Sequence, residues 1–347
     1  WTTSRTGKLR EPTALRLAEG GRKFIKVTKH YSNITYENED IEGWVKMAKA
    51  FENAGIDANE LNMCCPNMSF NVETTGEKIA KCTGASMGMR EDLVSAVVRA
   101  VKAETKVPLC VKLTPEGGRI AAVARAAYEA GADMVACVGN RLGIPPIDLE
   151  DPTGSPFHNQ EDPSITCLSG PWLKPLGLRD VFEVRKLVGP HQSIIGYGGM
   201  SRWNDYIEMS MMGADLIGMC TETMIRGYNF LYKEMARVKK YMEDHKYATF
   251  KSMRDTMVPE MKTAQTLRLG TAVAKVKTDT CTGCDLCIPI GHCYAITMVP
   301  GVGHPQKNRV GKVALVDPYK CTACSTCFDV CPFDCFGSFP GYFCCFF

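Results

Sequence analysis

Two cysteine runs near the C-terminal end of the 347-residue chain have the residue type and the spacing that hold metal centres. The first run contains Cys281, Cys284 and Cys287, with Cys293 further along, and the second contains Cys321, Cys324, Cys327 and Cys331, followed by Pro332. Thiolates two residues apart on a tight loop can converge on one iron–sulfur cube. The runs therefore predict two such centres, which would pass electrons one at a time.

The second run follows the C-x2-C-x2-C-x3-C-P pattern of bacterial two-cluster ferredoxins, in which the fourth cysteine ligates the other cluster. This rule predicts two [4Fe-4S] ligand sets, the first Cys281, Cys284, Cys287 and Cys331 and the second Cys321, Cys324, Cys327 and Cys293. The first run departs from the pattern, because five residues rather than three separate Cys287 from Cys293, and no proline follows Cys293.

Zinc sites and disulfides are the alternatives for these cysteines. Structural zinc also uses C-x2-C pairs, but it takes four ligands per ion, and a triple run suits it poorly. Disulfides need an oxidising compartment. Seven of the 18 cysteines are scattered through the first 220 residues without a pairing pattern, and no secretion signal or membrane-spanning apolar run is recognised. We therefore expect free thiols, iron–sulfur clusters and a cytoplasmic location.

A second group of reactive side chains follows strands predicted in the first half of the chain. Cys65 ends the segment Glu60-Leu-Asn62-Met-Cys64-Cys65, and Lys112 lies in Val111-Lys112-Leu113 at the end of the next strand. A free thiol has a pKa of about 8.5, so it is mostly protonated at neutral pH and can donate a proton. Alternatively, Cys65 is a small buried hydrophobe and Lys112 an ordinary surface lysine.

Strands alternate with helices along most of the chain. Hydrophobic periodicity predicts strands over 24–28, 58–65, 108–113, 134–138, 193–196 and 216–220, and helices over 12–19, 42–54, 92–104, 120–130, 178–188, 204–212, 228–244 and 261–269. Such alternation favours a parallel sheet covered by helices. Six strands satisfy a doubly wound sheet, whereas a (β/α)8 barrel needs eight, two of which would precede Trp1 or lie unrecognised in residues 1–22.

The glycine-containing segments after the last two strands favour the barrel. Tyr197-Gly198-Gly199 and Gly218-Met-Cys220-Thr221 fit a phosphate held by backbone N–H groups after strands seven and eight, although a plain turn is the alternative. No G-x-G-x-x-G opens a helix, so a dinucleotide-binding sheet has no support. We predict an α/β fold: a (β/α)8 TIM barrel with a connector over residues 1–269, then a small ferredoxin-like domain over 270–347.

The barrel segments and the tandem clusters together resemble the flavin-dependent dihydroorotate and dihydropyrimidine dehydrogenases. Their barrels carry L-N-x-S-C-P followed by K-L-T-P, and the dihydropyrimidine enzymes also end in a two-cluster domain; the match runs from Asn62 to Cys335. The resemblance implies FMN, with Lys112 at the N1–O2 edge of the flavin. It implies further FMN contacts from Gly170, Tyr197, Gly198, Gly199, Cys220 and Thr221. It also implies that Cys65 transfers the proton.

The predicted substrate contacts depart from that family. Asn62 would hydrogen-bond the substrate, but glycine stands at position 139, where pyrimidine-reducing relatives carry asparagine, unless Asn140 substitutes for it. Arg141 would place a positive charge near the substrate or be an ordinary loop arginine. We expect an oxidoreductase that interconverts a C=C bond and its dihydro form in a small pyrimidine-like, or otherwise anionic, substrate.

Electrons would leave through the clusters to a partner, because the chain shows no recognisable NAD or FAD site. The resemblance implies an NAD(P)H-linked flavoprotein subunit or a ferredoxin, in an oligomer or hetero-complex. Two alternatives stay open, an electron-transfer subunit with a relay barrel and a dihydroorotate dehydrogenase-like enzyme. With 41 basic and 38 acidic side chains and a net charge of +3, the balance argues against nucleic acid or an anionic membrane as partner.

Overall fold

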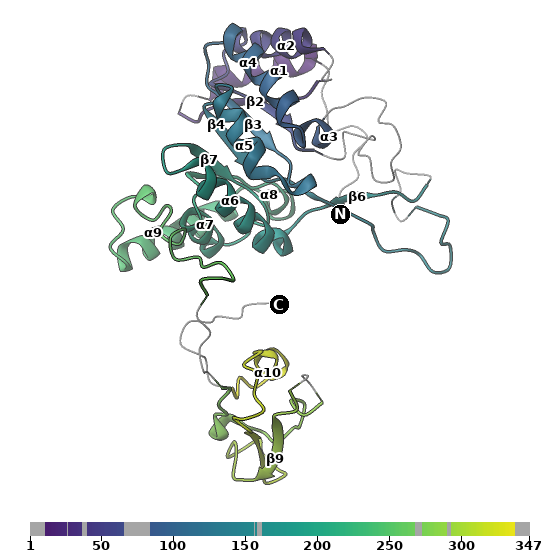
Figure 1. Ribbon diagram of the computed structural model, residues 1–347, viewed down its shortest axis with the longest axis vertical. Coiled ribbons are helices and arrows are strands. Elements are labelled where there is room, and N and C mark those ends of the chain that lie inside the picture. Colours follow the sequence, from purple (N-terminus) through teal and green to yellow (C-terminus); the bar gives the residue numbers. More distant parts are fainter. Residues whose placement is uncertain are drawn as a thin grey trace. The chain divides into compact units, whose positions relative to one another are not determined.

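The computed structural model describes residues 11–25, 27–36, 40–65, 84–155, 157, 162–267, 273–289 and 293–336. The chain divides into two compact units, Trp1–Met261 and Lys262–Phe347, which we call the barrel unit and the cluster unit (Figure 1). The boundary predicted near residue 269 thus lies inside the second unit, at a position outside the described residues. Pro66 and Asn67, which follow Cys65, also lie outside them.

The barrel unit contains one sheet of six parallel strands. In spatial order these are β1 (Tyr31–Ile34), β2 (Ala58–Met63), β3 (Leu109–Leu113), β4 (Met134–Cys137), β7 (Ser193–Gly196) and β8 (Leu216–Ile217). The spatial order follows the chain without reversal, whereas a doubly wound sheet reverses at a switch point. The sheet therefore has barrel winding, and the described residues supply six strands of such a barrel.

Helices pack around this sheet, and the short helix α8 also lines the cavity described below (Figure 1). They are α1 (Glu11–Phe24), α2 (Ile41–Asn53), α3 (Ala85–Gly88), α4 (Glu91–Glu104), α5 (Ile120–Glu129), α6 (Lys174–Val188), α7 (Trp203–Met211), α8 (Thr221–Arg226) and α9 (Phe230–Asp244). Helix α4 shows why they form, since Val94, Val97, Val98 and Val101 recur at helical spacing and are all buried. Between β4 and α6, β5 (Arg141–Gly143) and β6 (Thr166–Leu168) pair as an antiparallel hairpin.

Side chains alternate between the two faces of the strands, as the period of two requires. Leu61, Val111 and Ile194 belong to the main apolar core, which the helices share. Cys110 and Ile195 belong to a separate, smaller cluster on the opposite face. This second face also carries the reactive side chains of β2 and β3, so the pleat separates the packing residues from the candidate site.

The strand predicted over 24–28 is wrong. Helix α1 continues through Phe24, and the first strand of the sheet is β1, which pairs with β2. Phe24 and Val27 are apolar but 84% and 91% exposed, so neither contributes a core face. Residues 11–22, where disguised strands were considered, are helical and confirm the helix predicted over 12–19.

The segment after α9 is held to the barrel by ion pairs rather than by a helix. Arg185, only 2% exposed, pairs with Asp215 at 2.8 Å and with Asp255 at 3.0 Å, and Arg254 also pairs with Asp215. Residues 261–267 form turns, so the helix predicted over 261–269 is wrong in the part that the structure describes.

The cluster unit has little regular structure. Strands β9 (Ile296–Pro300) and β10 (Lys312–Val316) form an antiparallel pair, α10 (Thr326–Val330) is short, and Val276 bridges Phe336. Four of the eight buried residues in the described part of its core are cysteines. Loops therefore carry most of the predicted ligands.

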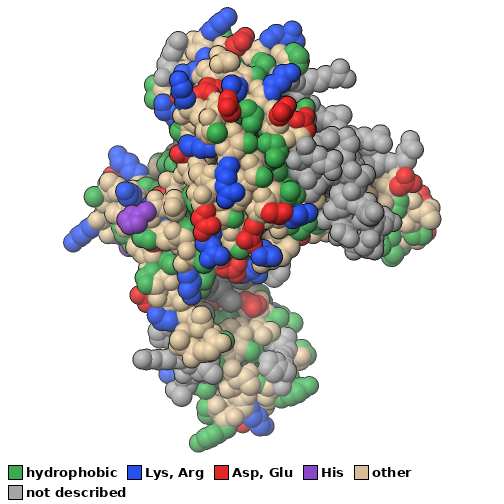
Figure 2. Space-filling view, turned by 45° about the horizontal axis from the view of Figure 1, so that its top comes forward, with side chains coloured by type: hydrophobic (Ala, Val, Ile, Leu, Met, Phe, Trp, Pro, Cys, Tyr) green, Lys and Arg blue, Asp and Glu red, His purple; other side chains and the backbone are tan. Residues whose placement is uncertain are grey.

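Both signs of charge are interspersed on the face of the barrel unit seen in Figure 2. Across the described parts of both units, no helix has the length and apolar character needed to cross a membrane.

Candidate active site and cluster cavities

A cavity of about 300 Å³ opens in the barrel unit beyond the carboxyl ends of its strands. Its walls include most of the residues that the sequence singled out in this unit: Cys65, Lys112, Asn140, Gly170, Tyr197, Gly198, Gly199, Cys220 and Thr221. Asn62 and Arg141, the other two barrel residues considered as substrate contacts, do not line it. Loops after five different strands thus converge on one space, which is where barrel active sites form.

Lys112 and Cys65 form the reactive centre of this cavity. The Lys112 Nζ lies 3.8 Å from the Cys65 Sγ, and it also lies 5.9 Å from the centre of the Tyr197 ring. The register of the sheet explains the first contact, because Lys112 pairs with Asn62 of β2, three residues before Cys65. A fixed cation at this distance stabilises negative charge on the sulfur when a proton leaves it.

Asn62 positions Cys65 by hydrogen bonds on both ends of its amide. Its Oδ1 accepts from the backbone N–H groups of Cys64 and Cys65, each at 3.2 Å. Its Nδ2 donates to the Cys65 Sγ and to Asn33 Oδ1, both at 3.1 Å. The side chain is 3% exposed. The predicted contact between Asn62 and substrate stays a prediction, and the structure adds a positioning role.

Asn33 is a site residue that the sequence analysis missed. It lies on β1, the strand that was not predicted, and pairs in register with Glu60 of β2. Its Nδ2 donates to the Glu60 carboxylate while its Oδ1 accepts from Asn62. The four residues Tyr31–Ile34 show no alternation of polar and apolar side chains, because the buried positions are a serine and an isoleucine, so the sequence carries no clear signal for this strand.

Glu60 is a buried carboxyl group whose charge interacts with that of Lys112. Burial raises the pKa of Glu60, and the charge of Lys112 and a hydrogen bond from Asn33 offset only part of that rise. Burial acts to lower the pKa of Lys112, but the surrounding thiols and Glu60 outweigh it, so the pKa of Lys112 lies above its usual value. Lys112 therefore keeps its positive charge although it is half-buried. This argues against the alternative that Lys112 is an ordinary surface lysine.

Cys64 and Cys65 lie in different surroundings although they are adjacent. Cys64 is fully buried beneath Gly139, and burial raises the pKa of its thiol to about 12. A Cβ added at Gly139 would lie 2.7 Å from the Cys64 Sγ. Only Cys65 lines the cavity. The structure thus separates one thiol that can reach a ligand from one that packs.

Glycines form part of the cavity wall, at positions where the surroundings leave no room for a side chain. Gly199 has φ +75°, and a Cβ there would lie 2.4 Å from the Lys174 backbone nitrogen. A Cβ at Gly218 would lie 2.0 Å from the Tyr197 ring. Exposed backbone at such a turn suits a phosphate group. Together with the cation at Lys112, this cradle fits a flavin mononucleotide.

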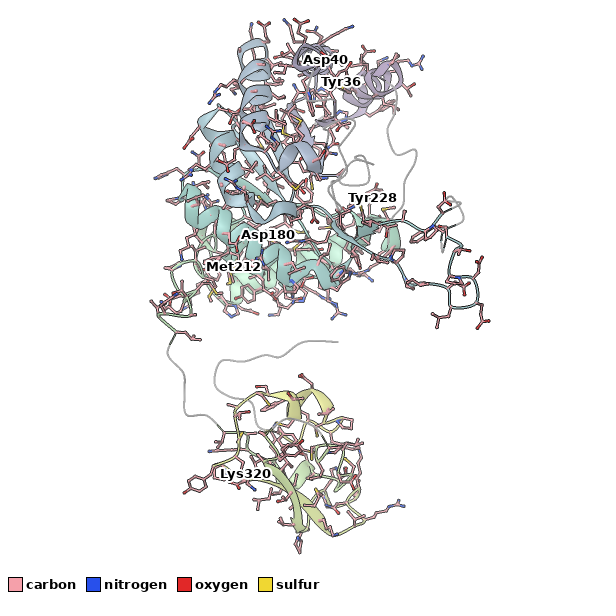
Figure 3. All side chains as sticks on the ribbon, turned by 45° about the vertical axis from the view of Figure 1, so that its right-hand side comes forward. Tyr36, Asp40, Asp180, Met212, Tyr228 and Lys320 are labelled. Atoms are coloured by element: carbon pink, nitrogen blue, oxygen red, sulfur yellow. The ribbon has the colours of Figure 1, made fainter. Side chains whose placement is uncertain are left out.

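The charge of Arg141 is neutralised by Asp180 rather than left for a substrate. Asp180, labelled on α6 in Figure 3, is 1% exposed and pairs with the Arg141 guanidinium. The same guanidinium donates to the Pro115 carbonyl at 3.3 Å. The structure therefore supports the interpretation of Arg141 as an ordinary loop arginine rather than as a positive charge for the substrate.

Two small cavities in the cluster unit gather the predicted cysteine ligands. One is lined by Cys281, Cys284, Cys287 and Cys331, together with Cys335. The other is lined by Cys293, Cys321, Cys324 and Cys327. Each set thus brings its fourth cysteine from the opposite run, including Cys293, whose spacing departs from the pattern.

The cysteines of each set suit the ligand requirement of a cluster. Each cavity gathers the four thiols that one [4Fe-4S] cube takes as ligands. The cysteines therefore fit [4Fe-4S] clusters.

A barrel with a glycine-lined cavity, joined to a two-cluster unit, defines a class of flavin and iron–sulfur redox proteins. The family model described as dihydroorotate dehydrogenase matches residues 21–242, and the model described as 4Fe-4S dicluster domain matches residues 260–335. The chain belongs to the dihydroorotate dehydrogenase family and carries a 4Fe-4S dicluster domain. These memberships imply FMN and iron–sulfur clusters as cofactors.

Curated relatives extend these matches. The chain is 29% identical over 258 residues to the NAD-dependent dihydropyrimidine dehydrogenase subunit PreA of Escherichia coli K12, covering 74% of this chain and 60% of that protein. It is 32% identical over 214 residues to the dihydroorotate dehydrogenase B (NAD(+)) catalytic subunit of Pyrococcus furiosus, covering 61% and 64%. The chain thus spans about three fifths of the length of these relatives.

A solved structure supports the same barrel fold. Dihydroorotate dehydrogenase (DHODH) of Eimeria tenella, in complex with ferulenol, aligns with a TM-score of 0.52 at 16% identity, covering 71% of this chain and 67% of that one. At this identity the likeness concerns the fold alone.

Proposed function

We propose that the chain is an FMN- and iron–sulfur-dependent oxidoreductase that interconverts a C=C bond and its dihydro form in a pyrimidine-like substrate. The observation that carries the proposal is the Cys65 thiol, 3.8 Å from the Lys112 ammonium in a cavity with a glycine-lined wall. Relatives named for dihydropyrimidine and dihydroorotate oxidation support the substrate class.

Cys65 handles the proton in this proposal. Bound FMN would supply hydride exchange with one carbon of the substrate. In the reducing direction the Cys65 thiol donates its proton to the neighbouring carbon, and in the oxidising direction the thiolate removes it. Lys112 stabilises the thiolate in both directions, and Asn62 fixes the sulfur through its hydrogen bond of 3.1 Å.

The cofactor and substrate contacts are proposed from the residues that line the cavity. Lys112 would hold the anionic edge of the FMN ring, and backbone groups of Gly170, Tyr197, Gly198, Gly199, Cys220 and Thr221 would hold its tail. Asn140 supplies an amide that can hydrogen-bond a ring amide of the substrate. Because Gly139 has no side chain and Arg141 pairs with Asp180, substrate recognition rests on fewer polar groups than the sequence suggested.

The eight cysteines of the two cavities are the proposed cluster ligands, in the two sets that the sequence predicts. Clusters bound there would supply single-electron transfer between the barrel and a partner that handles NAD(P)H, or a ferredoxin. The relatives named as subunits of NAD-dependent enzymes support a partner subunit.

An anaerobic titration tests this proposal. Dihydrouracil or dihydroorotate is added to cofactor-replete protein, and the visible absorbance of flavin and clusters is followed. We expect bleaching by one of them, and a rate lower by about 10²–10⁴-fold in Cys65→Ala with FMN still bound. Cys64→Ser is the matched control, because that thiol is buried outside the cavity, and it should bleach normally.

Absence of bleaching with both compounds, while dithionite still reduces flavin and clusters, would contradict the substrate class. Undiminished electron throughput in Cys65→Ala would instead favour an electron-transfer subunit with a relay barrel.

A further inference from the structure

Among its described residues, the cluster unit contains one cysteine beyond the eight that two clusters need, and this cysteine lies close to the proposed ligands. Cys335 is 3% exposed and lines the same cavity as the four proposed ligands of the first cluster. In the described residues, four cysteines line the other cavity and no fifth one joins them. The two cavities therefore differ in thiol number, five against four.

Cys335 lies directly beside one of the proposed ligands. Its backbone N–H donates to the Cys331 Sγ at 3.4 Å. Its own Sγ makes a long contact of 3.7 Å with the Phe333 carbonyl, which is a weak interaction for a thiol, and it also interacts with the side chains of Thr280 and Cys331. The Cys335 thiol is therefore within reach of the Cys331 sulfur, whose place on the iron it would take.

The backbone of Cys335 is also held by contacts that do not involve Cys331. Its carbonyl accepts from the Lys277 N–H at 2.5 Å, and the next residue, Phe336, bridges Val276. Phe336 is 2% exposed and packs on Phe328 with the ring centres 5.9 Å apart. Cys331, by contrast, follows the last turn of α10 and is half-buried. A change at Cys331 therefore leaves Cys335 in place.

We propose that Cys335 is a reserve ligand for the iron that Cys331 binds in the first cluster. In the exchange, the Cys331 thiolate leaves the iron, the Cys335 thiol binds it, and the Cys335 proton passes to the departing thiolate. No electron is gained or lost. The inference rests on the ligand sets proposed above. It means that the first cluster can survive the loss of its Cys331 ligand, whereas the second cluster has no spare thiol in the described residues.

Iron and acid-labile sulfide per chain, after anaerobic reconstitution, test the proposal in a set of variants. Wild type and Cys335→Ala should each hold about eight iron atoms, as two [4Fe-4S] clusters require. Cys331→Ala should also hold about eight, whereas Cys331→Ala/Cys335→Ala should hold about four. Cys293→Ala is the matched control, because its cavity has no reserve thiol in the described residues, and it should hold about four.

A fall to about four iron atoms in Cys331→Ala alone would overturn the reserve role while leaving the ligand sets intact. Eight iron atoms in Cys293→Ala, or fewer than eight in wild type, would overturn the ligand sets and this inference with them.

Cys331→Ser provides a second test that does not depend on the alanine variant folding, because serine keeps an acceptor for the Cys335 N–H. The readout is the EPR spectrum of the dithionite-reduced protein. If Cys335 takes over, the spectrum of Cys331→Ser should resemble wild type and differ from that of Cys331→Ser/Cys335→Ala. Identical spectra in the single and double variants would mean that serine binds the iron, and would contradict the proposal.

Discussion

The two units hold their functional side chains by different means. In the barrel unit, Lys112 and Asn62 project from neighbouring strands whose register sets their separation, over an apolar core shared with the helices. In the cluster unit, the cysteines stand on loops around small cavities, and cysteines themselves make up half of the buried core in the described part.

This difference shows which unit holds its site by protein contacts and which one needs metal binding to hold it. The barrel site is held by packing and by hydrogen bonds between protein groups. In its described residues, the cluster unit has two short strands, one short α-helix and one 3-10 turn, which is too little apolar burial to hold its loops, so metal–thiolate bonds must supply the remainder. Folding and metal binding are then one event in the cluster unit and separate events in the barrel unit.

Iron removal should give the largest effect and tests the contrast directly. Chelation under oxidising conditions should unfold the cluster unit, so that protease cleaves throughout it, while the barrel unit stays protected. Limited proteolysis read by mass spectrometry measures both at once. Equal protection of the two units after iron loss would break the comparison.

Replacing Lys112 should affect chemistry while the barrel stays folded. Lys112→Met removes the cation 3.8 Å from Cys65 and should slow anaerobic flavin reduction by about 10²-fold or more. Lys102→Met is the control, because Lys102 pairs with Asp133 on the outside of the barrel unit. A similar loss in both variants would point to a general structural effect instead.

Filling the space above Cys64 should destabilise the barrel unit in a way that a second substitution relieves. Gly139→Ala brings a Cβ within 2.7 Å of the Cys64 Sγ and should cost about 1–3 kcal/mol in the free energy of unfolding. Cys64→Ala removes the clashing sulfur. The double variant should therefore be more stable than the sum of the single effects, as a double-mutant cycle in urea would measure. Strict additivity would contradict the contact.

Glu60 should give the smallest effect, a change in pH dependence. Burial raises the pKa of Glu60 above its ordinary value of 4.5, so the folded state binds the proton more tightly than the unfolded state. Its contribution is fully present below 4.5 and is lost as pH rises through the folded value. Glu60→Gln should flatten this slope in urea unfolding. Glu104→Gln should change the slope in the opposite direction, because the hydrogen bond from Lys49 lowers the pKa of the Glu104 carboxyl group. An unchanged slope in Glu60→Gln would contradict the assignment.

The sequence predicted the fold wherever the apolar pattern was strong. Helix α4 was clear from four buried valines at helical spacing, Val94, Val97, Val98 and Val101. The apolar residues Phe24 and Val27 suggested a strand, but both are exposed. The true first strand carries Ser32 and Asn33, whose partners Asn59 and Glu60 lie on the next strand. Because those partners are distant in sequence, local periodicity could not reveal the strand.

The site was predictable where residue type alone restricts the chemistry. Cysteine spacing and the Gly198-Gly199 turn identified residues that do line cavities. The roles of Arg141 and Asn62 depended on partners brought by folding, Asp180 in one case and Cys65 in the other. Such pairings follow from tertiary contacts, which one sequence does not contain.

The most direct test of the central claim, that the barrel does the chemistry and the clusters take the electrons, is a stopped-flow experiment. Anaerobic holoprotein is mixed with the dihydropyrimidine that bleaches it, and flavin and cluster absorbance are followed separately. The account predicts that flavin reduction comes first, that cluster reduction follows it, and that Cys65→Ala slows both together. Cluster reduction that precedes flavin reduction, or that persists at full rate in Cys65→Ala, would contradict it.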